Sequence, residues 1–218
     1  MSFRHALWKD ARREMRGKEG VQAGLVLVGL FFVVFLFAHG DLSREPAAAA
    51  VVLWVPIVFA AAAVAGRGFA AEADRGTLDL LRSAPAPLVV HGVSRTLIDL
   101  AIGAIVMAGT VVLARFLFNV PVSVPLLVLL LVALVGIIVV GSIAGALASQ
   151  ARARELLLPI LMVPLLAPLL LGGVRATLVL LDDRGSQSWG PAVMVLVGYD
   201  LVMAGLAWLL WPIVLEGD

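Results

Sequence analysis

Six long runs of apolar residues alternate with short polar segments along the chain. The runs are Val21–Ala38, Ala47–Gly66, Leu97–Phe118, Val124–Ala148, Leu156–Val174 and Pro191–Leu215. An α-helix of about 20 apolar residues crosses the hydrocarbon core of a bilayer, so each run is close to or above the spanning length. The pattern predicts an all-α integral membrane protein in which residues 1–218 form a single transmembrane domain of six helices.

The first 20 residues form a charged segment with a helical spacing of apolar positions. Phe3, Leu7, Ala11 and Met15 recur every four residues, and basic residues occupy most positions between them. We predict that residues 1–20 form an amphipathic helix in the headgroup layer. A frayed, solvated tail is the alternative. A cleaved signal peptide is disfavoured because acidic residues interrupt this long leader.

Composition excludes several classes of protein. The 218 residues are 62% hydrophobic and 14% charged, with a mean hydropathy of +1.07 and a net charge of +1. A soluble enzyme or a disordered chain would be far more polar, and the near-zero charge gives no case for nucleic-acid binding. The chain has no Cys, which excludes disulfides and thiolate metal sites within it.

Basic residues predict the orientation in the membrane. With six spans both termini lie on one side, and that side receives twelve of the sixteen Lys and Arg residues. Lys and Arg accumulate in cytoplasmic loops. We therefore expect both termini, and the long polar segment 67–94, on the cytoplasmic side of the membrane.

Polar residues inside the runs are the candidates for chemistry. Asp200 lies near the middle of the sixth run, and we weigh a gating or proton-coupled carboxylate against a structural hydrogen bond. Asp99 follows Arg95 by four residues, so we expect the two to pair on one helix face. His39 and His91 lie at opposite membrane faces and cannot share a metal. No phosphate loop or catalytic motif is present, so we expect a non-catalytic chain without its own metal or nucleotide.

The polar segment 67–94 predicts a short helix at the cytoplasmic surface. Gly76 interrupts the preceding helix, Thr77 offers a cap for a new one, and Pro85 ends it. Leu78 and Leu81 share one face of this helix, and that face requires either the membrane surface or a partner protein as cover. A generic surface loop is the alternative.

These residues carry a resemblance to a known family. The pattern formed by Phe69, Glu72, Gly76, Thr77, Leu78, Leu81 and Pro85 resembles the coupling segment of ABC exporter permeases. The fifth run contains Pro159, Pro164 and Pro168, and the sixth contains a Tyr-Asp pair. Together with the overall plan, they make the chain similar to haem exporter protein B, the CcmB family of the cytochrome c maturation system.

The resemblance implies a membrane permease subunit that works with other chains. Its partners would be the ATPase subunit CcmA, which binds ATP, the haem-handling subunit CcmC, the small subunit CcmD and the haem chaperone CcmE. Two copies per complex are expected, with haem as a possible cargo of the complex. The three prolines of the fifth run are either hinges of a moving helix or static kinks.

Two other functions stay open at this point. A permease of another ABC exporter, for a lipid, a polysaccharide or a drug, would share the topology and the coupling helix. An intramembrane enzyme would use Asp99 and Asp200 as an aspartyl pair, although Asp99 is expected nearer the cytoplasmic edge than Asp200.

Overall fold

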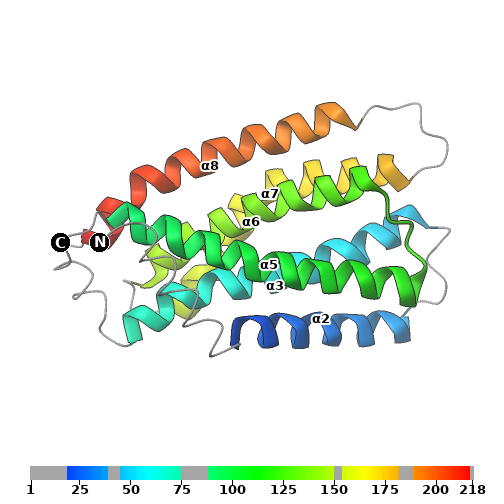
Figure 1. Cartoon of the computed structure of the whole chain (residues 1–218), viewed down its shortest axis with the longest axis horizontal. Helices are drawn as coiled ribbons and strands as arrows, with labels where there is room; N and C mark the ends of the chain where they lie inside the picture. Colours follow the sequence, from blue (N-terminus) through cyan, green and yellow to red (C-terminus); the bar gives the residue numbers. More distant parts are fainter. Residues whose placement is uncertain (1–18, 39–44, 75–87, 150–153, 182–188, 217–218) are drawn as a thin grey trace.

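The structure is a computed structural model that describes residues 19–38, 45–74, 88–149, 154–181 and 189–216. These residues form long helices and no strand (Figure 1). The helices are α2 (Glu19–Ala38), α3 (Pro46–Asp74), α5 (Leu88–Phe118), α6 (Val124–Ser149), α7 (Arg154–Leu181) and α8 (Gly190–Glu216). All six are long and apolar enough to cross a membrane, which confirms the predicted all-α membrane fold.

Local sequence sets several helix ends. Pro46 is the first residue of α3, where its missing N–H would be unpaired in any case. Asn119 ends α5 with a φ of 52°, a left-handed conformation that Asn tolerates better than most residues. Ser123 then caps α6, because the Leu126 N–H donates to its Oγ at 3.4 Å. These residues make the short turn between α5 and α6.

Three helices extend beyond the apolar runs that predicted them. The second run ends at Gly66, yet α3 continues to Asp74. The third run begins at Leu97, yet α5 begins at Leu88, and α7 continues past Val174 to Leu181. An apolar run marks the part of a helix that fits in hydrocarbon, whereas the helix itself continues until a residue interrupts it.

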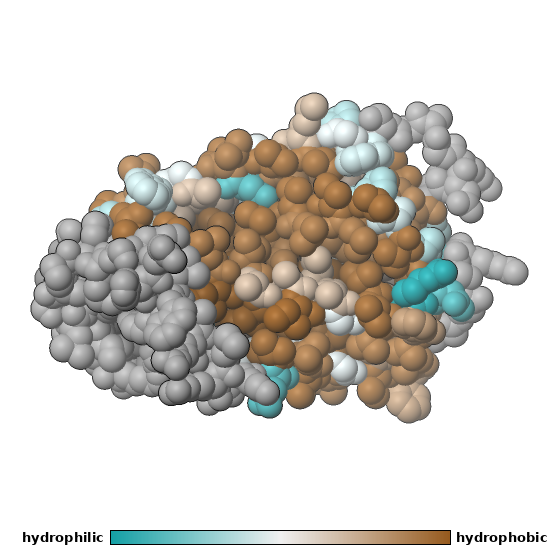
Figure 2. All heavy atoms as spheres, viewed as in Figure 1, coloured by the Kyte–Doolittle hydropathy of each residue, from teal (hydrophilic) through white to brown (hydrophobic). Residues whose placement is uncertain are grey.

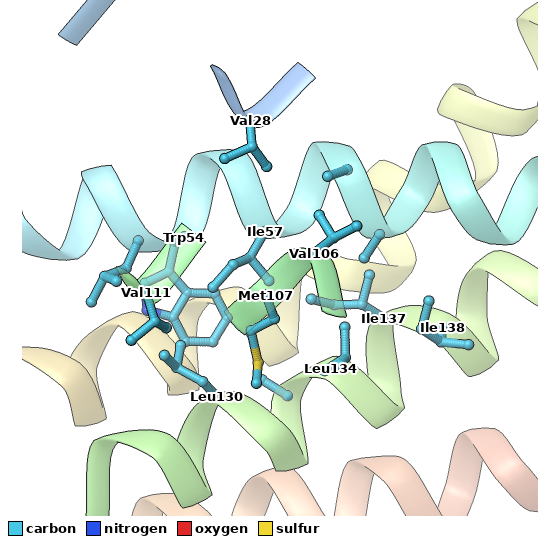
Figure 3. Close-up of a cluster of buried hydrophobic side chains, with 14 of the residues drawn as sticks. Val28, Trp54, Ile57, Val106, Met107, Val111, Leu130, Leu134, Ile137 and Ile138 are labelled. Atoms are coloured by element: carbon cyan, nitrogen blue, oxygen red, sulfur yellow. The ribbon is translucent and has the colours of Figure 1, made fainter. Parts of the chain in front are cut away.

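Helix α6 lies at the centre of the bundle. It contacts α3, α5, α7 and α8, while α2 packs on α3 and α5. The buried share of its spanning window is 72%, against 17% for α2 and 11% for α8, and α2 and α8 form opposite edges (Figure 1). Figure 3 shows the core where α2, α3, α5 and α6 meet, with Val28, Trp54, Ile57, Val106, Met107, Val111, Leu130, Leu134, Ile137 and Ile138.

The outer surface of the bundle is apolar along most of its length. Figure 2 shows hydrophobic side chains over the middle of the visible face. Large apolar side chains point outwards from the two edge helices, for example Val26 and Phe37 of α2 and Met194 and Leu201 of α8. Such a surface is the expected one for lipid contact, because acyl chains are as apolar as leucine.

Two predicted surface helices fall outside the described residues. Residues 1–18 of the N-terminal segment and the predicted helix at 77–84 belong to this part of the chain. Glu19 and Gly20, the last residues of the predicted interfacial helix, belong instead to α2, and Gly20 begins its spanning part.

Candidate functional site

The predicted coupling segment lies between two helices that pack against each other. Phe69 and Glu72 belong to the last turns of α3. Gly76, Thr77, Leu78, Leu81 and Pro85 lie outside the described residues. The chain returns to the described part at Leu88, the first residue of α5, and α5 contacts α3 along the bundle. Residues 75–87 thus connect two adjacent helices.

A buried ion pair lies in the first third of α5. Arg95 Nη2 is 2.8 Å from Asp99 Oδ1, and the Asp99 side chain is completely buried. Arg95 Nε also donates to Asp99 Oδ2 at 3.3 Å. This arrangement confirms the predicted pairing of Arg95 with Asp99. Removal of one partner would leave the other as a buried charge, which is strongly destabilising.

Hydroxyl groups join α5 to α6 in the same region. Thr96 Oγ1 donates to the Gly92 carbonyl at 2.9 Å and lies 2.8 Å from Ser142 Oγ of α6. The indole of Trp211 in α8 covers Gly92, where a Cβ would lie 2.8 Å from Trp211 Cγ. Sequence reasoning did not identify Thr96, Ser142 or Trp211. The available signal was a hydroxyl residue inside an apolar run for Ser142 and directly before one for Thr96, and Trp211 gave none.

The Tyr-Asp pair of α8 contacts two different helices. The Tyr199 hydroxyl donates to the Leu165 carbonyl of α7. The Asp200 carboxyl lies against Gly136 of α6, where a Cβ would be 3.3 Å from the carboxyl carbon and closer still to Oδ1. Asp200 Oδ1 is buried without a hydrogen-bond partner among the described residues. Asp99 pairs with Arg95 on α5, whereas Asp200 lies against α6.

Helix α7 is continuous through its three prolines. Pro159, Pro164 and Pro168 all lie within Arg154–Leu181, and the side chains of Pro164 and Pro168 are exposed. A proline removes one helical hydrogen bond and pushes on the preceding turn. Because both exposed rings face outwards, they do not interrupt packing between α7 and the core.

The second half of α7 is joined to α3 by a buried hydrogen bond. Trp54 Nε1 donates to Thr177 Oγ1 at 2.9 Å, and Thr177 Oγ1 donates to the Gly173 carbonyl at 2.9 Å. The outer edge of the Trp54 ring lies directly on Gly173. This junction fixes the two helices at one point of contact.

Histidine positions offer no cluster of metal ligands in the described part of the chain. His91 is buried in the first turn of α5, and His39 falls outside the described residues. Within the described ranges no group of three or more His, Cys, Asp or Glu side chains is placed to hold a metal ion.

Comparisons with known proteins agree with this architecture. The family model described as CcmB protein matches residues 1–213, nearly the whole chain. The comparison with curated proteins gives no match. The six apolar helices and the family match together identify a multi-pass protein of the inner membrane. The chain therefore belongs to the CcmB family, the permease components of a haem exporter complex in cytochrome c maturation.

Proposed function

We propose that this chain couples ATP hydrolysis by a separate ATPase subunit, CcmA, to the release of the haem-loaded chaperone CcmE. It does so as a non-catalytic membrane subunit with both termini in the cytoplasm. CcmC and CcmD are its other membrane partners, and two copies act in the complex. The proposal extends the family assignment to a specific step.

The observation that carries the proposal is that α3 ends directly before residues 75–87 and α5 begins directly after them. Both helices continue as helix beyond the apolar runs, and they contact each other and the central helix α6. A force on residues 75–87 therefore acts on two rigid helices at once. We propose that Gly76, Thr77, Leu78, Leu81 and Pro85 contact the ATPase, with Phe69 and Glu72 in the adjoining part of α3.

The polar contacts of α5 support transmission beyond these two helices. Thr96 links α5 to Ser142 of α6, and Trp211 of α8 covers Gly92. Movement of the first turns of α5 would reach both α6 and α8 through these contacts. In this mechanism ATP binding on the partner subunit moves the start of α5, and α6 and α8 follow.

The test replaces residues of the segment and measures two separate outputs. Glu72→Ala and Leu81→Asp should each reduce co-purification of CcmA with the chain. Both should also deplete c-type cytochromes on a haem-stained gel while CcmE keeps its bound haem. Glu45→Ala is the matched control, since Glu45 is exposed at the opposite end of α3. Normal CcmA binding and normal cytochromes in both variants would refute the coupling role.

A strain lacking the chain tests the assignment to CcmE release. Loss of c-type cytochromes with haem retained on CcmE supports that step. Normal c-type cytochromes would refute it and would favour a permease for another substrate.

A further inference from the structure

Helix α8 is attached to the bundle by a narrow line of side chains. Only 11% of its spanning window is buried, and it lies along one edge of the bundle (Figure 1). Its buried positions are Leu196, Asp200, Ala207 and Trp211, which recur every four or seven residues. This seam packs mainly on α6, with α7 beside Leu196 and α5 beside Trp211.

Asp200 is the polar member of this seam. The residue is 9% exposed, and its carboxyl occupies the space that a Cβ on Gly136 of α6 would need. The side chain of Leu169 in α7 closes the same space. Seven residues further along each helix, Ile143 and Ala207 belong to one buried cluster. Asp200 therefore lies inside the contact between α6 and α8.

Among the described residues, the helices packed around α8 present no opposite charge to Asp200. The α6 sequence contains no titratable residue. The Tyr199 hydroxyl on α8 is directed to the Leu165 carbonyl. Arg175 of α7 is exposed, and Arg154 and Glu155 lie at the far start of that helix. The remaining groups are on α5, where Arg95 and Asp99 pair with each other, His91 lies in the first turn and Arg115 is exposed near the end.

A carboxylate in this seam would be a buried charge without a counter-charge. Such a charge is strongly disfavoured in a low-dielectric interior, and polar groups in hydrocarbon carry the same kind of penalty. A neutral carboxyl fits the closed seam, because it can pack against a glycine without a partner charge. Separation of α8 from α6 would admit water, and the carboxyl could then release its proton to that water.

We propose that Asp200 is a proton-binding site that latches α8 to α6. With the proton bound, the carboxyl packs on Gly136 and the seam is closed. When the proton leaves to water, the carboxylate must be hydrated, and α8 moves away from α6. The expected consequence is a seam that opens as the pH rises.

The first test uses dicyclohexylcarbodiimide, an apolar reagent that modifies protonated carboxyl groups within membranes. The full chain in membranes is treated at pH 6 and pH 9, and the modified residues are identified by mass spectrometry. We expect modification of Asp200 at pH 6 and a loss of at least several-fold at pH 9. Asp99 is the internal control, because its pairing with Arg95 should keep it unreactive. Absence of modification at Asp200, or equal modification of Asp99, would overturn the proposal.

The second test measures the separation of α6 and α8 directly. Because the chain has no Cys, Leu131→Cys and Val195→Cys introduce a unique pair of spin-label sites. Leu131 of α6 is 47% exposed and Val195 of α8 is 64% exposed, so the labels avoid the core. The sample is diluted with unlabelled chain, so that only distances within one copy are recorded.

We expect the α6–α8 distance distribution to gain a longer population at pH 9 in the protein with Asp200. The same labels with Asp200→Asn should give the short distance at both pH values, because Asn cannot ionise. A distance that does not respond to pH with Asp200, or that responds equally with Asn, would overturn the latch.

Discussion

The junction between Trp54 and Gly173 allows a quantitative test of how α3 and α7 pack. A Cβ built on Gly173 would lie 3.1 Å from Trp54 Cζ3 and closer still to Cη2 and Cζ2. These three atoms form the outer edge of the indole. Gly173→Ala must therefore displace a ring that is only 3% exposed. Overpacking of this kind costs about 1–3 kcal/mol.

The reciprocal change, Trp54→Phe, removes the atoms that touch Gly173. It also removes the donor to Thr177 Oγ1, a type of interhelical bond worth about 0.6 kcal/mol in membranes. With the cavity left by the missing ring, we expect a total loss of about 2 kcal/mol. Thr177 keeps its bond to the Gly173 carbonyl, so no buried donor is left unpaired.

The double variant Trp54→Phe/Gly173→Ala should be more stable than the sum of the single effects. The added methyl group fills the space that the smaller ring leaves, and residues in direct contact show coupling energies of about 0.5–3 kcal/mol. We expect coupling of about 1–2 kcal/mol, with a sign that restores stability.

The assay is equilibrium unfolding in mixed micelles with increasing SDS, followed by far-UV circular dichroism. Gly29→Ala is the matched control, because no atom lies within 4 Å of a Cβ at that position. It reports the gain in helix propensity alone, about 1 kcal/mol in favour of alanine. Additive effects of Trp54→Phe and Gly173→Ala would refute the packing described for this junction.

Three further changes test the contacts of α5 and α8. Arg95→Ala removes the partner of buried Asp99 and should cost about 3–5 kcal/mol of stability, seen as a loss of folded, monodisperse protein on size-exclusion chromatography. The double variant Arg95→Ala/Asp99→Ala should recover most of the yield, and an equally poor double variant would contradict this. Thr96→Val and Ser142→Ala each remove the same interhelical hydrogen bond, worth about 0.6 kcal/mol. In SDS unfolding, the double variant should therefore show no additional loss of stability from that bond. Fully additive costs would argue against the hydrogen bond. Tyr199→Phe removes the hydrogen bond to the Leu165 carbonyl of α7 and should cost about 1 kcal/mol of stability, measured as a lower midpoint of thermal unfolding. An unchanged midpoint would exclude a stabilising hydrogen bond.

The apolar pattern was sufficient for the number and type of the membrane-spanning helices in the described part of the chain. Each of the six runs corresponds to a helix long enough to span a membrane, because an unbroken apolar run of this length has few other stable conformations in lipid. The ends of the helices were less predictable. Residues 67–74 and 88–96 contain charges and small residues, and they nevertheless continue α3 and α5, since helix formation there does not depend on contact with hydrocarbon.

Some contacts of the candidate site could be predicted from the sequence, and others could not. The pairing of Arg95 with Asp99 was predictable because both residues lie on one helix, four positions apart. The position of Asp200 against Gly136, and that of Thr96 beside Ser142, depend on which faces of two different helices meet. Small and apolar residues on every side of a membrane helix give no periodic signal for that choice.

The place of α6 has a consequence for how sequence variation in this protein should be judged. Its spanning segment is the most apolar of the six, yet it is also the one most shielded from lipid. This helix would also be stable in contact with lipid, because its side chains are as apolar as acyl chains. Close packing against its neighbours therefore accounts for its central position, and avoidance of water does not. A change such as Ile137→Leu or Val140→Ile, at fully buried positions, would leave any hydropathy profile nearly unaltered while disturbing the fit. On α8 the reverse holds, because its outward positions tolerate any apolar shape. Damaging substitutions in this family should therefore concentrate where hydropathy registers no change.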